Sequence, residues 1–132
     1  MRMQVARSES NDNLTVFDPS YFKQQFGEAW EAVFVDLGAT FLEHSESSIA
    51  ELNAAIDDGQ HGSVAKISHS LKGGAVSMGE TELADLFAKI EDEPDSLQLS
   101  DWQDQVEALW ATVSATIRQE LQRIASKQQV TV

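Results

Sequence analysis

The sequence contains no cysteine and only two prolines among its 132 residues. Without cysteine the chain can form no disulfide, no thiolate metal site and no thiol nucleophile, a composition typical of a reducing compartment. No apolar run exceeds four residues, as in Ala32–Val35 and Ala108–Ala111. The sequence therefore offers neither a membrane-spanning helix nor the apolar core of a signal peptide, and we expect a cytoplasmic protein.

Basic residues are scarce as well. The chain has 9 Lys and Arg residues against 22 Asp and Glu residues, a formal net charge of −13. Binding to nucleic acid or to an anionic membrane surface needs clustered basic residues, so neither partner is expected. The length is typical of a single domain that can bury a hydrophobic core. Composition thus predicts a small acidic domain.

Apolar residues recur at helical spacing along most of the chain. Residues 1–16 are polar and lack this periodicity, so we expect a mobile N-terminal tail. Asp18 and Pro19 are typical of a helix start, and Gly27 of a break. Amphipathic helices are predicted over residues 19–26, 28–58, 60–78 and 81–92, with a last helix starting at a capping box formed by Ser100 and Gln103.

This pattern predicts an all-α protein. Long helices with short connections favour an antiparallel up-down-up-down four-helix bundle over residues 17–132, with a short extra N-terminal helix. The inward stripe predicted for residues 28–58 consists of Trp30, Phe34, Leu37, Phe41, Ser45, Ser48, Leu52 and Ala55. Gly79 stands where a left-handed helix cap is needed.

One face of the segment 60–78 carries unusual residues. Its apolar stripe, which includes Leu71, points inward, so His69 is expected on the opposite, solvent-facing side. The neighbours of His69 at helical spacing are Ala65, Lys66, Lys72, Gly73 and Val76. A glycine and an apolar valine are poor choices for a solvated helix face. This face is therefore a candidate functional surface.

The charge pattern supports this interpretation. Residues 59–79 contain no acid, although one residue in six of the chain is acidic, and the two lysines of this window flank His69. We therefore predict a positive local field. A neutral imidazole is a competent nucleophile near pH 7, and phosphoryl transfer needs mainly positioning and positive charge. Lys72 can offset the charge of a phosphate, and Gly73 leaves room for a partner's active site.

The run His69-Ser70-Leu71-Lys72-Gly73, followed by Gly79 ten residues after the histidine, closely resembles the signature of the histidine-containing phosphotransfer (HPt) family. The next helix fits with Leu83-Ala84 and Ile90-Glu91, and Phe41-Leu42-Glu43 looks like part of the family's second helix. The resemblance covers about residues 18–92 by pattern and the last helix by architecture. Ser68 departs from it, because many members carry a small residue such as alanine before the histidine.

The resemblance implies a role for each matching residue. His69 would be phosphorylated, normally through Nε2, and Lys72 would support the phosphate. Gly73 would give receiver domains access, with Ala65, Lys66 and Val76 on the same docking surface. The implied partners are response-regulator receiver domains and a hybrid histidine kinase. The Mg²⁺ ion would belong to the receiver, so the chain itself would need neither cofactor nor metal.

Other chemistry is not indicated by the sequence. No two histidines lie four residues apart and no Glu-x-x-His pair exists, which argues against a metal site in the bundle. No phosphate-binding glycine loop is present, so the chain should be a phosphoryl carrier without an ATP site rather than an enzyme. His44 is interpreted as a boundary residue and His61 as solvent-facing. The acidic run Glu91–Asp95 is interpreted as a solvated helix end.

These residues distinguish three possible functions. The first is a phosphorelay intermediate that carries a phosphoryl group on His69 between receiver aspartates. The alternative is an HPt-like interaction module that binds a receiver domain or a histidine kinase without being phosphorylated. A small hydrolase is disfavoured, because no nucleophile with an orienting base is evident. We expect a monomer, and Met1 followed by a polar segment without kinase elements favours a stand-alone protein.

Overall fold

A computed structural model describes residues 19–130 of the chain, with side chains described as far as Lys127. The described residues form, in order, α2 (Pro19–Phe26), the 3-10 helix η2 (Gly27–Ala29), α3 (Trp30–Asp57), α4 (His61–Ser77), α5 (Thr81–Asp92) and α6 (Leu99–Val130). They contain no strand. The tail expected over residues 1–16 lies outside the described residues.

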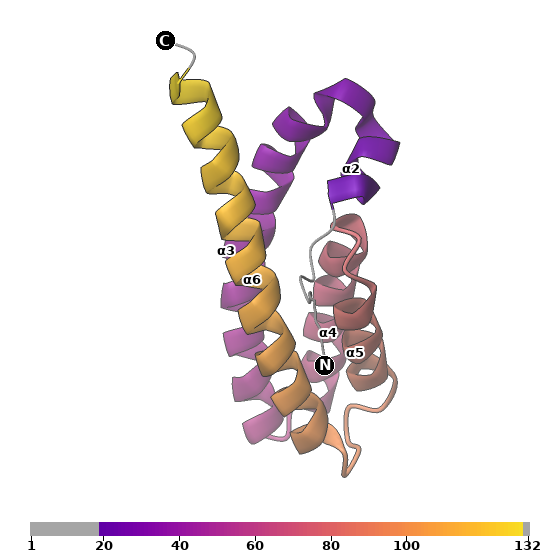
Figure 1. Ribbon diagram of the computed structural model, residues 1–132. Coiled ribbons are helices and arrows are strands. Elements are labelled where there is room, and N and C mark those ends of the chain that lie inside the picture. The colour runs from indigo at the N-terminus through magenta and orange to yellow at the C-terminus, as the bar shows by residue number, and fades with distance from the viewer. Residues whose placement is uncertain (1–18, 131–132) are drawn as a thin grey trace, which may run out of the picture.

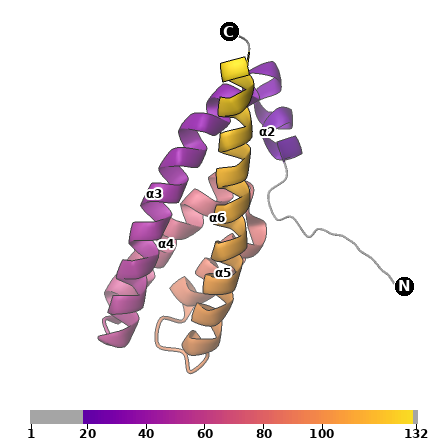
Figure 2. The same ribbon diagram turned by 60° about the vertical axis from the view of Figure 1, so that its left-hand side comes forward.

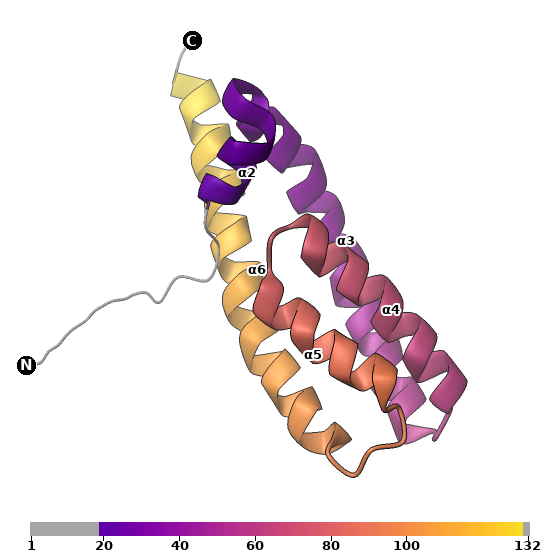
Figure 3. The same cartoon turned by 90° about the vertical axis from the view of Figure 1, so that its right-hand side faces the viewer.

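The two longest helices, α3 and α6, form the frame of the molecule (Figure 1). The shorter helices α4 and α5 pack along one half of this frame, α4 beside α3 and α5 beside α6 (Figure 3). Helix α2 folds back at the other end of α3 (Figure 2). This confirms the all-α bundle with a short extra N-terminal helix.

Apolar side chains from every α-helix meet in the interior. Phe22 of α2 packs edge-on against Phe34 of α3, with ring centroids 5.3 Å apart, so an aromatic contact joins the short helix to the bundle. The largest fully buried side chains are Phe22, Phe34, Phe87, Leu52, Leu71, Leu83, Ile90, Ile117 and Ile124. They lie at the helical spacing read from the sequence, because each helix buries one apolar stripe.

Gly79 fixes the turn between α4 and α5. Its φ of 74° lies in the left-handed region, as predicted for a helix cap. A Cβ atom at this position would lie 2.8 Å from Cγ of Tyr21, because the tyrosine ring of α2 covers the glycine. The turn therefore requires glycine at this position for two reasons, its left-handed backbone conformation and the close approach of α2.

The prediction that Leu37 belongs to the inward stripe of α3 is wrong. Leu37 is 37% exposed, and the buried position is Gly38. A Cβ at Gly38 would lie 3.5 Å from Ile117 of α6, so the bare backbone of α3 lies close to α6 here. The inward stripe passes through a residue with no side chain, which hydrophobic periodicity does not detect.

The predicted capping box at the start of the last helix is also wrong. Helix α6 begins at Leu99, and the carbonyl of Gln98 accepts the hydrogen bond from the backbone N–H of Trp102. The side chain of Gln103 donates instead to Oδ1 of Asn53 in α3, at 2.9 Å. The contact with Asn53 thus occupies the side-chain amide of Gln103, which would have formed the capping box with Ser100.

Glu80, next to Gly79, leads to a testable effect of pH on stability. Its side chain is buried at 4% exposure, and burial raises the carboxyl pKa from 4.5 to about 7, with a contribution from the charge of Glu82. The folded state therefore favours the protonated form, and its stability falls as pH rises from about 4.5 to 7. A shift of this size corresponds to at most about 3 kcal/mol.

We expect Glu80→Gln to raise the free energy of unfolding by about 2 kcal/mol at pH 8 and to change it little at pH 4.5. Urea denaturation at both pH values measures this difference. Glu82→Gln is the matched control on an exposed neighbour, and it should have the smaller effect. An unchanged pH dependence in Glu80→Gln would contradict the assignment of the buried charge.

Candidate functional site

Helix α4 presents His69 to solvent. The residues on its inner side, Ser68, Leu71 and Ala75, are buried, and this fixes the rotation of the helix. The His69 side chain is consequently 70% exposed, as the sequence predicted. A partner protein can reach the ring without any movement of the bundle.

Glu91 of α5 holds one nitrogen of this ring. Its Oε2 lies 2.9 Å from Nδ1 of His69. Because a carboxylate only accepts hydrogen bonds, Nδ1 is the nitrogen that carries the proton. In the neutral ring the lone pair then resides on Nε2. The contact between the helices therefore selects the tautomer whose lone pair is on Nε2, the ring nitrogen that Glu91 does not contact.

The same carboxylate also binds Lys72. Nζ of Lys72 lies 2.9 Å from Oε1 of Glu91, so one side chain bridges the histidine and the lysine. The ion pair with Lys72 is the main cause that lowers the pKa of Glu91, and the bond with His69 lowers it further. The pKa of Lys72 is raised in turn. Glu91 is thus a carboxylate and Lys72 an ammonium ion near neutral pH.

This arrangement corrects two predictions. Glu91 is not part of a solvated helix end, because its side chain is only 24% exposed and lies against α4. The field around His69 is not simply positive either, since Glu91 offsets the charge of Lys72. Residues 59–79 lack acids, but α5 supplies one from the neighbouring helix, which spacing along a single helix does not reveal.

Gly73 and Val76 lie on the exposed side of α4 with His69. A Cβ at Gly73 would meet no atom within 4 Å, and Val76 is 56% exposed. Lys66 is exposed and Ala65 is half-buried. Gly73 and Val76 thus leave this side of His69 open, whereas a Cβ at Gly74 would touch Phe41 at 3.5 Å.

The other two histidines lie outside the cluster formed by His69, Lys72 and Glu91. Nε2 of His44 in α3 lies 3.2 Å from Oγ of Ser70 in α4, and His61 is exposed at the start of α4. Within residues 19–127, no group of three or more His, Cys, Asp and Glu side chains could hold a metal ion. None of the described helices has the length and hydropathy needed to cross a bilayer.

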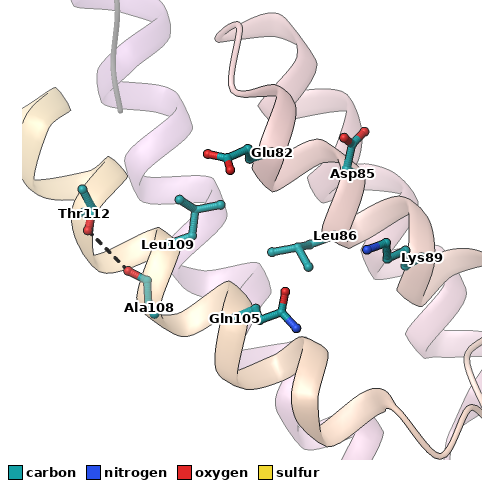
Figure 4. Close-up of a pocket in the computed structure, with 8 residues that line it drawn as sticks. All are labelled: Glu82, Asp85, Leu86, Lys89, Gln105, Ala108, Leu109 and Thr112. Carbon is teal, nitrogen blue, oxygen red and sulfur yellow. Dashed lines mark hydrogen bonds between the residues drawn. The ribbon is translucent and has the colours of Figure 1, made fainter. Parts of the chain in front are cut away.

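A cavity of about 550 Å³ opens between α5 and α6 (Figure 4), and His69 is not among the residues that line it. Leu86 and Leu109 line it together with the polar residues Glu82, Asp85, Lys89, Gln105 and Thr112. Its lining includes neither Lys72 nor Glu91. The hydroxyl of Thr112 donates to the carbonyl of Ala108 in its own helix. The cavity therefore shares no lining residue with the cluster of His69, Lys72 and Glu91.

Comparison with known proteins agrees with this geometry. The Hpt domain family matches residues 36–127, well over half of the chain, so the chain belongs to this family. The crystal structure of histidine-containing phosphotransfer protein B (HptB) from Pseudomonas aeruginosa PAO1 is similar to the chain, with a TM-score of 0.69 and 25% sequence identity. The match covers 84% of this chain and 98% of that one. No curated protein matches the chain.

The chain is therefore a histidine phosphotransfer module of two-component signalling. Modules of this family are phosphocarriers rather than kinases, and they interact with receiver domains and kinases. The resemblance found in the sequence is confirmed. One contact of the site, the bridge made by Glu91, was missed, although the Ile90-Glu91 pair already fitted the family pattern.

Proposed function

We propose that the chain carries a phosphoryl group on Nε2 of His69, which it accepts from the aspartyl phosphate of one receiver domain and passes to the aspartate of another. The observation that supports this proposal best is the 2.9 Å contact between Nδ1 of His69 and Glu91. It leaves the lone pair on Nε2 of a ring that is 70% exposed.

The transfer balances without any other reactant. The Nε2 lone pair attacks phosphorus, the bond from phosphorus to the receiver's aspartate breaks, and that aspartate leaves as a carboxylate. The ring keeps its proton on Nδ1 and gains positive charge as the new bond to phosphorus forms. Glu91 faces this proton and stabilises the charged ring. The reverse steps deliver the group to the second receiver.

Lys72 supplies the positive charge for the phosphoryl oxygens, one helical turn from His69. Its contact with Glu91 keeps the ammonium group beside the imidazole before a partner docks. The remaining charge compensation would come from the Mg²⁺ ion of the receiver. Among the described residues of this chain, no group of three or more His, Cys, Asp and Glu side chains could hold a metal ion. We propose that the chain acts as a cytoplasmic monomer.

A direct assay tests this function. The chain is incubated with phosphoramidate, and separately with a panel of phosphorylated receiver domains from the source cell, at early times. We expect label that is labile in acid and stable in base, as a phosphorus–nitrogen bond to histidine requires. No labelling from either type of donor would refute the proposal and favour a module that binds without being phosphorylated.

Glu91→Ala tests the role of the bridge. Without the carboxylate the proton is no longer held on Nδ1 and the charged ring loses its partner. We expect phosphorylation by phosphoramidate to slow about tenfold, equivalent to about 1.4 kcal/mol, as for one hydrogen bond to a charged group. Asp92→Asn is the matched control on the exposed neighbouring acid. Equal rates for Glu91→Ala and the wild type would make the bridge a purely structural contact.

Gly73→Gln tests access to the histidine. A Cβ at Gly73 would meet no atom within 4 Å, and a glycine inside a helix costs up to about 1 kcal/mol, so the isolated bundle should be at least as stable as the wild type. The glutamine covers ground that a receiver must occupy, so transfer from the receiver should fall at least about tenfold. Labelling by phosphoramidate should stay near the wild-type rate. An unfolded variant would show that the glycine is needed for packing.

A further inference from the structure

A small apolar groove lies between α3 and α4. It has a volume of about 180 Å³ and is lined by Leu37, Thr40, Phe41, His44, Gly74, Ser77 and Met78. Phe41 and Met78 are 6% and 2% exposed and form its buried wall, whereas Leu37 is 37% exposed at its edge. Gly74 contributes no side chain to the groove, and a Cβ there would lie 3.5 Å from the ring of Phe41.

The dimensions and chemistry of this groove limit what it can hold. Sites for small molecules usually measure about 300–1,000 Å³, so this groove fits one or two side chains rather than a metabolite. Its lining contains no acidic residue, although the chain carries a formal charge of −13. An apolar side chain from another protein fits both features.

The groove is continuous with the exposed surface around His69. On α4, Ser77 of the groove lies four residues after Gly73 of the His69 surface, so the two are neighbours on the helix, and the hydroxyl of Ser77 donates to the carbonyl of Gly73 at 3.1 Å. Ser70 lies four residues before Gly74 on the same face of α4. Its hydroxyl contacts His44 at the rim of the groove. A protein that covers His69 and Gly73 therefore also covers this groove.

We propose that the groove receives one large apolar side chain of the receiver domain that docks over His69, and that it selects among receivers by this side chain. This inference rests on the proposed function and identifies a specificity determinant beside the phosphorylated residue. A receiver brings carboxylates and a phosphate to His69, and an acid-free groove beside them adds no repulsion. A receiver with a charged residue at this point would have to bury an unpaired charge and would be rejected.

Helix α3 offers a matched pair of variants for the test. Leu37 and Val35 are both 37% exposed, but only Leu37 lines the groove. The probe is the receiver domain that transfers fastest to the wild-type chain in the panel. We expect Leu37→Glu to weaken its binding and to slow its transfer about 10- to 100-fold. Val35→Glu should change both by less than about twofold.

Phosphoramidate separates this proposal from the proposed function. It needs no docking surface, so Leu37→Glu should take label from it at the wild-type rate. If the wild type takes no label from any donor, the proposed function fails. If Leu37→Glu is labelled by phosphoramidate and by the receiver as fast as the wild type, the groove proposal alone is overturned.

Two further measurements keep the test decisive. Thr40→Glu places the same charge at an exposed rim position, so it replaces Leu37→Glu if that variant unfolds, with the same expected loss of receiver transfer. Sedimentation equilibrium of the wild type checks whether a second copy of the chain fills the groove. Self-association that Leu37→Glu abolishes, with receiver transfer unchanged, would overturn the proposal.

Discussion

Replacing His69 by glutamine is expected to abolish phosphorylation from receivers and from phosphoramidate, while the fold stays intact. The side chain is 70% exposed and makes one contact to another helix, so its loss should change the free energy of unfolding by no more than about 0.5 kcal/mol. Glutamine has no nitrogen lone pair that can attack phosphorus. Labelling assays and thermal unfolding measure the two parts of this result.

The other histidines provide the controls for this variant. His44→Gln and His61→Gln remove rings that lie outside the cluster of His69, Lys72 and Glu91, so both variants should take label from phosphoramidate at the wild-type rate. Label that persists in His69→Gln would place the phosphorylated residue elsewhere.

Lys72→Ala is expected to slow phosphotransfer about 10- to 100-fold, which corresponds to about 1.4–2.7 kcal/mol. The variant removes the cation beside the phosphoryl group and leaves the charge of Glu91 without its ammonium partner. Single-turnover transfer from the receiver measures the rate, and the lifetime of the phosphohistidine should change as well.

Two variants delimit this effect. Lys72→Arg keeps the positive charge and should retain part of the rate, although a planar guanidinium differs in shape from an ammonium ion. Lys89→Ala removes another lysine, one that lines the cavity between α5 and α6, and it should leave transfer unchanged. If Lys72→Ala transfers as fast as the wild type, Lys72 is only a solvated surface residue.

The helices were largely predictable because each buries a stripe of side chains at helical spacing. The short helix over 19–26 and the helix over 81–92 have the predicted bounds, and α3 and α4 differ from prediction by one or two residues at each end. The two errors arose where a contact between helices decides the outcome. Gly38 packs against α6 although it has no apolar side chain, and Gln103 binds Asn53 instead of capping its own helix.

In the candidate site too, the residues of one helix were predictable from the sequence and the residue supplied by a second helix was not. His69, Lys72 and Gly73 lie within two turns of one helix, so their common face follows from the helical repeat alone. The exposure of His69 and the open space at Gly73 agree with that prediction. Glu91 lies 22 residues beyond His69 on a different helix, and no periodicity within α4 points to it.

The sequence by itself therefore determined the helical bundle and the outward face of α4, because local propensity and apolar periodicity act over a few turns of one helix. Only the tertiary structure decided which carboxylate faces the histidine, which ring nitrogen keeps the proton and where a groove opens beside the site. These features depend on the rotation and separation of helices that are far apart in the chain. Their positions are set by packing of the whole core, as in the contact of Glu91 with His69.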